Sequence, residues 1–173
     1  MSTYNENTKL GKIGEQLIHS YLTSRLSSDS KVIFIRGQVN QRNCGDICVI
    51  KPEGQKIFIE VKTEASNKHE NFFLEEFSNR KTRKPGWMRY CNADILFYVF
   101  LKSNEVYAMS LSKLQRWFYE TGIFRDYPLK LQRSNEQDND TYGYVVPIKN
   151  LVELGNTIKF STISTAVLSQ EGK

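Results

Sequence analysis

Residues 45–62 read GDICVIKPEGQKIFIEVK and predict two short apolar strands joined by a turn. Pro52 presets its own φ for the turn, and Gly54 is free to adopt a positive φ. Three charged residues interrupt strands that are otherwise suited to burial: Asp46, Glu60 and Lys62. A hairpin with charges at these positions needs a reason beyond packing.

Position parity predicts which side chains of the hairpin share a face, because successive residues of a strand point to opposite faces. The odd-numbered residues are uniformly apolar and form the expected core face: Ile47, Val49, Ile57, Ile59 and Val61. If the odd faces of the two strands coincide, Asp46, Glu60 and Lys62 converge near one end of the other face. The pattern therefore brings two carboxylates and one ammonium group together.

One interpretation of this cluster is a surface ion pair on a half-exposed sheet, which contributes about 0 to 1 kcal/mol. The other interpretation is a metal site. Two neighbouring carboxylates repel each other unless a cation joins them, and their oxygens suit Mg²⁺ or Mn²⁺. Lys62 would then orient or activate a metal-bound water. The position of the charges at a strand end, within a β-rich run, favours the metal site.

Two motifs carry a resemblance to a known family. G-D-I-C-V-I, followed after the turn by I-F-I-E-V-K, resembles the PD-(D/E)XK nuclease superfamily, with Asp46 as its aspartate and residues 60–62 as its E-x-K. Gly45 and Cys44 stand where some members have a proline before the aspartate. Residues 11–15, GKIGE, open a helix in the style of resolvase-like members, whose first helix often carries a glutamate that joins the metal site. Residues 78–98 are similar to a segment of phage and mobile-element nucleases.

The resemblance implies an α/β fold with a restriction-endonuclease-like core, in which an N-terminal helix precedes a mixed β-sheet flanked by helices. It implies a metal-dependent endonuclease that hydrolyses DNA phosphodiester bonds and leaves a 5′-phosphate. The implied cofactor is Mg²⁺, with Mn²⁺ as a substitute, held by Asp46, Glu60 and the main-chain carbonyl of Val61. The implied catalytic residues are Asp46, Glu60, Lys62 and Glu15. For Glu15, an ordinary solvated helix glutamate is an equally good interpretation.

A basic segment, residues 80–90, combines five cations with Trp87 and Tyr90 around a Pro-Gly turn. Five cations this close repel one another, and a phosphate backbone would relieve the repulsion. We expect DNA backbone contacts from Arg80, Lys81, Arg83, Lys84 and Arg89. For the two aromatic residues, core packing is favoured slightly over base stacking. The net charge of +5 supports a polyanionic partner without requiring one.

Other functions share these residues and stay open. Within the nuclease interpretation, a homing or restriction-type enzyme, a Holliday-junction resolvase and a repair nuclease are all compatible with the motifs. An RNA-directed nuclease uses the same site chemistry. A non-catalytic DNA-binding module, with the charges as a structural network, is the alternative outside enzymes. Cleavage of two strands with one site per chain favours a homodimer.

The 173 residues, 39% of them hydrophobic, predict a single domain with a core over about residues 8–155. An apolar stripe from Leu10 to Leu22 predicts the first helix. We expect a tail over 161–173, a polar loop over 133–141 and a short helix over 148–154. A second helix is expected to be capped by Ser112 and to end at Tyr119. Strands are expected over residues 31–36, 45–50, 56–63, 71–77, 93–101, 105–111 and 142–148.

Residues that would indicate other classes are sparse. Three cysteines, Cys44, Cys48 and Cys91, are an odd number, and neither histidine stands at a zinc-site spacing. The longest apolar run, from Ile95 to Leu101, is far too short to cross a bilayer. We therefore expect reduced cysteines, a cytoplasmic protein, no membrane contact and no organic cofactor.

Overall fold

The structure is a computed structural model, and it describes residues 4–132, 140–152 and 157–161. The fold is α/β, with a six-stranded mixed sheet and a separate four-stranded antiparallel sheet. The six-stranded sheet has the order β1 (Lys31–Phe34), β2 (Ile47–Ile50), β3 (Lys56–Glu64), β6 (Ile95–Phe100), β7 (Glu105–Ser110) and β10 (Thr157–Ser161). The four-stranded sheet has the order β5 (Lys84–Pro85), β4 (Asn71–Asn79), β9 (Thr141–Pro147) and β8 (Leu129–Gln132).

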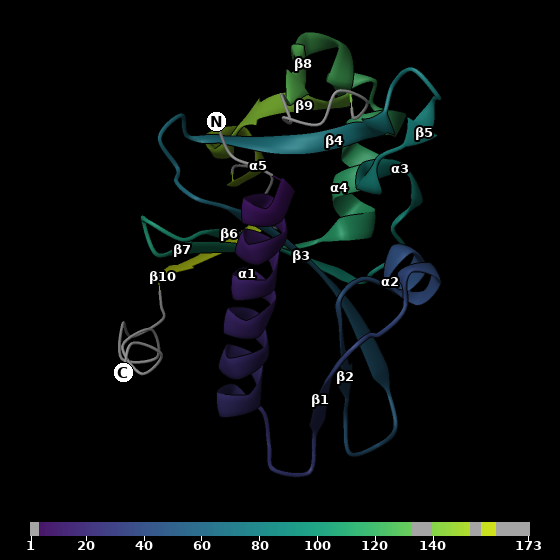
Figure 1. The fold of residues 1–173 in the computed structure, drawn as a ribbon. Helices are drawn as coiled ribbons and strands as arrows, with labels where there is room; N and C mark the ends of the chain where they lie inside the picture. Colours follow the sequence, from purple (N-terminus) through teal and green to yellow (C-terminus); the bar gives the residue numbers. More distant parts are fainter. Residues whose placement is uncertain (1–3, 133–139, 153–156, 162–173) are drawn as a thin grey trace.

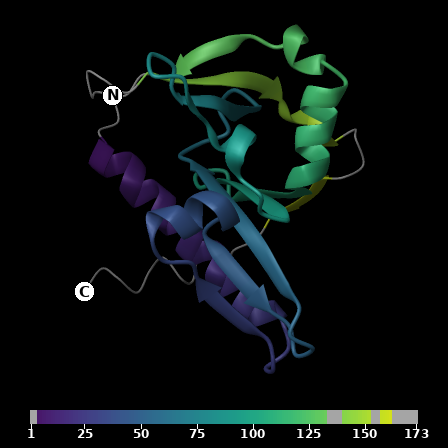
Figure 2. The same cartoon turned by 90° about the vertical axis from the view of Figure 1, so that its right-hand side faces the viewer.

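The long N-terminal helix and the second sheet cover the six-stranded sheet from opposite sides (Figures 1 and 2). The described helical elements are α1 (Tyr4–Arg25), α2 (Gln38–Cys44), α3 (Trp87–Tyr90), α4 (Leu111–Glu120), the 3₁₀ helix η1 (Ile123–Asp126) and α5 (Ile148–Val152). The long helix α1 packs on one face and contacts β3 and β1. The second sheet lies over the other face. None of the described helices is long and apolar enough to span a membrane.

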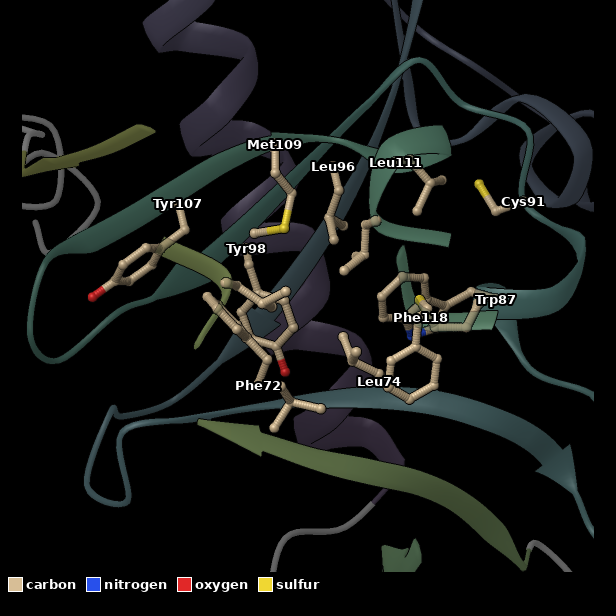
Figure 3. Packing of buried hydrophobic residues seen from close by; sticks show 14 of the residues in the cluster. Phe72, Leu74, Trp87, Cys91, Leu96, Tyr98, Tyr107, Met109, Leu111 and Phe118 are labelled. Carbon is tan, nitrogen blue, oxygen red and sulfur yellow. The ribbon is translucent and has the colours of Figure 1, made fainter. Parts of the chain in front are cut away.

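Each face of the central sheet has its own apolar core. The predicted odd face of the hairpin is confirmed, since Ile47, Val49, Ile59 and Val61 are buried in the cluster that α1 covers. Along β6 the same alternation places Phe97 in that cluster. The even residues of β6 enter the second cluster, which also holds Phe72, Leu74, Trp87 and Phe118. Figure 3 shows Phe72 and Leu74 pointing from β4 toward Tyr98 and Leu96.

Tyr98 connects the two sheets through its hydroxyl group. The main-chain N–H of Phe73, on β4, donates to the Tyr98 hydroxyl over 3.0 Å. The hydroxyl in turn donates to the Glu64 carboxylate at the end of β3. A buried tyrosine needs such partners, because an unpaired buried hydroxyl is unfavourable. The two sheets are therefore held in one arrangement by a directional contact as well as by apolar packing.

Several predicted elements agree with the structure, and others need correction. The first helix, the hairpin, and the strands near residues 71, 95, 105 and 142 are all present. The predicted cap Ser112 is wrong: β7 ends at Ser110, whose hydroxyl accepts the Lys113 N–H, so α4 begins at Leu111. Features that were not predicted include α2 between β1 and β2, the short helices α3 and η1, strand β10 beyond the expected core, and the second sheet. Of the expected loop and tail, residues 133–139 and 162–173 lie outside the described residues.

A buried carboxylate organises the packing of the second sheet. Glu76, on β4, is 4% exposed. Arg89, on α3, contacts its Oε1 through Nε and a terminal nitrogen at 2.7 and 2.6 Å. The Tyr119 hydroxyl donates to Oε2 over 2.6 Å, and the Arg89 guanidinium lies 4.1 Å from the centre of the Tyr119 ring. This network joins β4, α3 and α4 at a single buried charge.

Arg89→Met should lower the free energy of unfolding by about 2 kcal/mol, because it leaves the buried Glu76 carboxylate without its cation. The estimate is below the range for fully buried pairs, because the Arg89 side chain is about half exposed and admits water. Urea denaturation of both proteins measures the difference. The control, Arg116→Met, removes an exposed contact to Glu120 at 3.9 Å and should change stability by about 0.5 kcal/mol or less. Equal effects of the two substitutions would contradict a structural role for the Glu76 network.

Candidate active site

The register of the hairpin places Asp46 across from Glu60. In the ladder between β2 and β3, Ile47 pairs with Ile59, so the residues next along each strand face each other at the end of the ladder. The main-chain N–H of Asp46 donates to the Ile59 carbonyl over 2.7 Å. The Asp46 carboxylate accepts the Val61 N–H through Oδ2 over 2.9 Å. Both bonds hold the Asp46 side chain directly beside β3, as the parity of the sequence predicts.

Gly45 makes this approach of the two strands possible. Its φ is +89°, in the region that favours glycine, and a Cβ atom at this position would overlap the Ile59 carbonyl oxygen. The Gly45 N–H also donates to the Gln41 carbonyl over 2.8 Å, which ends α2. A residue that the resemblance treats as a substitute for proline therefore has its own structural function. It allows the chain to leave α2 and enter β2 against the β3 backbone.

Lys62 forms an ion pair with Glu60. The Lys62 Nζ atom lies 2.5 Å from Glu60 Oε1, and the two side chains are 32% and 7% exposed. The other oxygen of Glu60 lies 3.5 Å from the Cys91 sulfur. Lys62 Nζ also lies 5.5 Å from the centre of the Trp87 ring, and Trp87 itself is buried, as predicted. The ammonium group is thus positioned by an acid on one side and an aromatic ring on another.

The charged groups of the site shift the pKa of Asp46 and of Lys62. Burial, and after it the negative charge of Glu60, raises the pKa of Asp46 to about 7, against the opposing charge of Lys62 and the Val61 N–H. For Lys62, burial lowers the pKa, but the charges of Glu60 and Asp46 outweigh burial and hold it above its ordinary value. Lys62 therefore stays protonated at neutral pH. Asp46 gains and loses its proton near neutral pH when nothing else compensates its charge.

Helix α1 brings Glu15 to the same place. Gly14 is buried against β3, where a Cβ atom would overlap the Thr63 side chain, so glycine allows α1 to lie close to the strand. The next residue, Glu15, reaches the cleft that contains the acid pair. Burial raises the pKa of Glu15, and the charge of Lys62 lowers it. Glu15 thus lines the same cleft as Asp46, Glu60 and Lys62, and its role in the site stays a prediction.

These side chains line an open cleft of about 510 Å³. The acids and Lys62 come from α1 and the hairpin, one wall comes from α2, and other contributions come from α3 and from the β4–β5 region. The lining residues are Glu15, Val39, Gln41, Arg42, Asp46, Glu60, Lys62, Ser78, Lys84 and Tyr90. The cleft therefore combines clustered carboxylates with cations and aromatic surface at its sides.

The basic segment divides between the cleft and other contacts. Lys84 lines the cleft, while Arg83 is exposed at a positive φ of 55°. The Arg80 guanidinium lies 4.6 Å from the centre of the Tyr142 ring, and the Lys81 ammonium lies 3.4 Å from an Asp140 oxygen. Arg89 is bonded to the buried Glu76 instead of being directed to the acid pair. DNA contacts by these five residues stay predictions, and Lys84 is the member of the five that lines the cleft with the acids.

Sequence reasoning missed a further acid near Lys62, as well as the α2 residues and Ser78 that line the cleft. Burial raises the pKa of Glu75, on β4, while the charge of Lys62 and the Trp87 N–H lower it. Glu75 is therefore a further acid close to Lys62. Gly86 packs closely against the Glu75 backbone, since a Cβ atom at position 86 would overlap the Glu75 carbonyl oxygen. The sequence contains no signal for this placement, because it depends on how the second sheet packs on the first.

Metal binding at this cleft would need ligands beyond side chains. Within the described ranges, no group of three or more His, Cys, Asp or Glu side chains has the arrangement of a metal site. Asp46 and Glu60 supply two carboxylates, and further ligands would have to be main-chain carbonyls, water or substrate oxygens. This is the usual situation for Mg²⁺, which keeps several waters and takes one or two carboxylates together with substrate phosphates.

Neither a model of a known protein family nor a curated protein matches this chain. The chemistry of the cleft is therefore the main guide to its function.

Asp46→Asn should stabilise the metal-free protein at pH 8 by on the order of 2 kcal/mol. The folded-state pKa of Asp46 is raised to about 7, so its contribution to stability is complete below about pH 4 and is lost as the pH rises through 7. The advantage of the variant should therefore grow between pH 4 and 7 and stay constant above that. Thermal unfolding in EDTA across this range measures it, with the exposed Asp126→Asn as control. If the stability difference between Asp46→Asn and the wild type does not change with pH, the pKa of Asp46 is not raised in the folded protein.

Proposed function

We propose that this protein is a divalent-metal-dependent endonuclease that hydrolyses DNA phosphodiester bonds. The observation that carries the proposal is the placement of Asp46 across from Glu60 within an open cleft, with Lys62 paired to Glu60 at 2.5 Å. A surface ion pair does not need two acids beside one cation. Two acids held together by strand register, one buried and the other partly buried, do need a further positive charge, and a divalent cation would supply it.

Asp46 and Glu60 fit Mg²⁺ because they are hard oxygen donors on adjacent strands, and the charge of Glu60 adds to burial in raising the pKa of Asp46. By the family resemblance, the Val61 carbonyl would be a further ligand. Bound Mg²⁺ would stabilise charge that develops on a phosphate and lower the pKa of a coordinated water. Mn²⁺, which takes the same ligands, is the expected substitute.

The protein's own residues would then bind and position the substrate. Lys62 stays protonated and is partly exposed to the cleft, so it can donate to a phosphate oxygen or to the attacking water. Its contact with Glu60 fixes the ammonium group before substrate binds, so little reorganisation is needed. Glu15, at the edge of the same cleft, would accept a hydrogen bond from water in the site.

DNA as the substrate is supported by the distribution of charge around the cleft. Lys84 and Arg42 line it, and Arg83 is exposed next to Lys84. The acids alone would repel a phosphate, so the cations provide the attraction along the walls and the metal provides it at the acids. The net charge of +5 agrees with a polyanionic partner.

We also propose that the central sheet is a restriction-endonuclease-like core. Supporting this, α1 packs on the sheet, the β2–β3 hairpin carries the acids, and β6 lies parallel to β3. The helix α2 and the four-stranded sheet are additions to the order of elements that the resemblance implies. The enzyme would be of the homing, restriction or Holliday-junction-resolvase type. A homodimer would allow one site per chain to cut both strands.

A second candidate function is a DNA-binding module without catalysis. The pairing of Lys62 with Glu60 favours it, because with Asp46 protonated the cluster is neutralised by the protein's own groups. In that case the cations of the cleft would bind DNA, and divalent ions would change neither stability nor activity. Cleavage assays separate the two functions.

With Mg²⁺, the wild-type protein should cleave DNA, and Asp46→Asn should abolish cleavage because it removes one of two metal-binding charges. Lys62→Met should lower kcat by on the order of 10² or more, since it keeps the side-chain length and removes the charge that stabilises the transition state. Substrates tested side by side should be a linear duplex, a four-way junction, single-stranded DNA and RNA. Asp126→Asn and Lys56→Met serve as controls of the same chemical type on exposed residues.

Wild-type cleavage rates in Asp46→Asn would place the active site elsewhere, and unchanged kcat in Lys62→Met would make Lys62 a structural residue. Cleavage confined to the junction would indicate a resolvase, whereas one cut site in a long duplex would indicate a homing or restriction enzyme. No cleavage of any substrate, combined with DNA binding, would support the module without catalysis.

The double substitution Arg83→Ala and Lys84→Ala should weaken binding to every DNA sequence by a similar factor. It should also make the slope of log K against log salt less steep by about 1 to 2, because each lost phosphate contact removes roughly 0.9. Binding would be measured in Ca²⁺ over a salt series. The matched control removes two exposed lysines outside the cleft, Lys56 and Lys130. A slope equal to that of the wild type would exclude these two residues from the DNA interface.

A further inference from the structure

The wall of the cleft that α2 forms is rich in side-chain amides. Its sequence is QVNQRNC, in which four of seven residues are amides and one is arginine. Three of its side chains line the cleft beside the acid pair: Val39, Gln41 and Arg42. Asparagine and valine are weaker helix formers than alanine or leucine, whereas glutamine and arginine are good ones. Helix formation therefore does not by itself account for a valine, an amide and an arginine at the positions that line the cleft.

Contacts at both ends of α2 hold it as a fixed wall. At its end, the Gly45 N–H donates to the Gln41 carbonyl, and the Asn92 N–H donates to the Asn43 carbonyl over 3.1 Å. The Arg42 guanidinium stacks 4.6 Å from the centre of the Tyr90 ring on α3. At its start, the Asn40 amide donates to the Arg36 carbonyl over 3.3 Å. The side chains that line the cleft are thus presented by a backbone that is already ordered.

The cleft-lining side chains have unused binding capacity. Val39 is 74% exposed, although it adjoins a cleft in which apolar surface could be covered. The Gln41 side-chain amide forms no hydrogen bond within the described ranges. Arg42 has no acidic partner in the same ranges, and one face of its guanidinium is occupied by Tyr90. A single exposed valine is ordinary, but an exposed valine, a free amide and an unpaired arginine lining one cleft form a ligand-binding surface.

The chemistry of these three groups matches the edges of DNA bases better than it matches phosphate. A glutamine amide can donate to and accept from adenine together, arginine donates to the two acceptors of guanine, and an apolar side chain contacts the thymine methyl group. Phosphate oxygens are acceptors alone, so the carbonyl of Gln41 and the methyl groups of Val39 would gain nothing from them. Lysine or arginine at all three positions would serve backbone binding better.

We infer that α2 reads base sequence in the DNA that enters the cleft, with Val39, Gln41 and Arg42 as specificity-determining residues. This inference rests on the proposed function, because it takes the substrate of the cleft to be DNA. Lys84 and Arg83, from the β4–β5 region, would hold the backbone, while α2 contacts bases near the scissile phosphate. The protein would therefore prefer particular bases at a few positions close to the cut.

The test is a binding selection on duplexes with a randomised central segment, carried out in Ca²⁺ and followed by sequencing. The wild type should select a base at one or more positions. Gln41→Met keeps the shape of the side chain and removes its amide, so preference at one position should fall by roughly 5- to 150-fold. Val39→Ala should relax a neighbouring position. Gln55→Met, the same change in the exposed hairpin turn far along the strands from Asp46, is the matched control and should keep the full preference.

Two results would overturn the inference while leaving the proposed function intact: a wild type that binds and cuts duplexes of every sequence equally, and a preference that persists in both Gln41→Met and Val39→Ala. Thermal unfolding of each variant separates lost recognition from lost folding, since a folded Gln41→Met with unchanged preference still counts against base reading. A wild type that neither binds nor cuts DNA would instead refute the proposed function, and the inference with it.

Discussion

The close approach of Asp46 to Glu60 is the constraint on which the rest of the structure depends. Two carboxylates repel each other, and burial makes the repulsion worse, yet strand register holds these two together. The Asp46 N–H donates to the Ile59 carbonyl, and the Val61 N–H donates to the Asp46 carboxylate, so both the backbone and the side chain of Asp46 are fixed against β3. Gly45 and Gly14 remove the Cβ atoms that would separate the elements around them. The fold therefore maintains a local excess of negative charge that packing alone would not favour.

The two faces of the central sheet contribute to that arrangement in different ways. The odd residues of the hairpin pack beneath α1, and the burial of their apolar side chains stabilises the hairpin. The even residues of β6 pack toward the second sheet, whereas Asp46, Glu60 and Lys62 of the hairpin line the open cleft. The part of the sheet under the second sheet is apolar and buried, whereas the part that lines the cleft is charged. The same sheet can therefore be both a scaffold and a binding surface.

Local patterns in the sequence predicted the hairpin register and the placement of Asp46, Glu60, Lys62 and Glu15, because alternation and helical periodicity determine faces directly. Pairing between distant segments could not be predicted in this way. Strand β4 pairs with β9, roughly seventy residues later in the chain, and no local signal specifies that partner. Glu75 and Glu76 reach their sites only through this pairing. The same long-range packing gives two cations of the basic segment different environments: Lys84 lines the cleft, whereas Arg89 pairs with the buried Glu76.

Direct measurement of divalent-ion binding tests the central claim, that the acid pair holds a metal, without assuming any substrate. Mn²⁺ can be titrated into the metal-free protein and the free ion measured by electron paramagnetic resonance. The account predicts one Mn²⁺ site per chain that is lost in Glu60→Gln and kept in Glu53→Gln, an exposed glutamate of the hairpin turn. It also predicts tighter binding at pH 8 than at pH 6, because Asp46 must lose its proton. No bound Mn²⁺ at millimolar concentration, or equal binding in Glu60→Gln, would contradict the account.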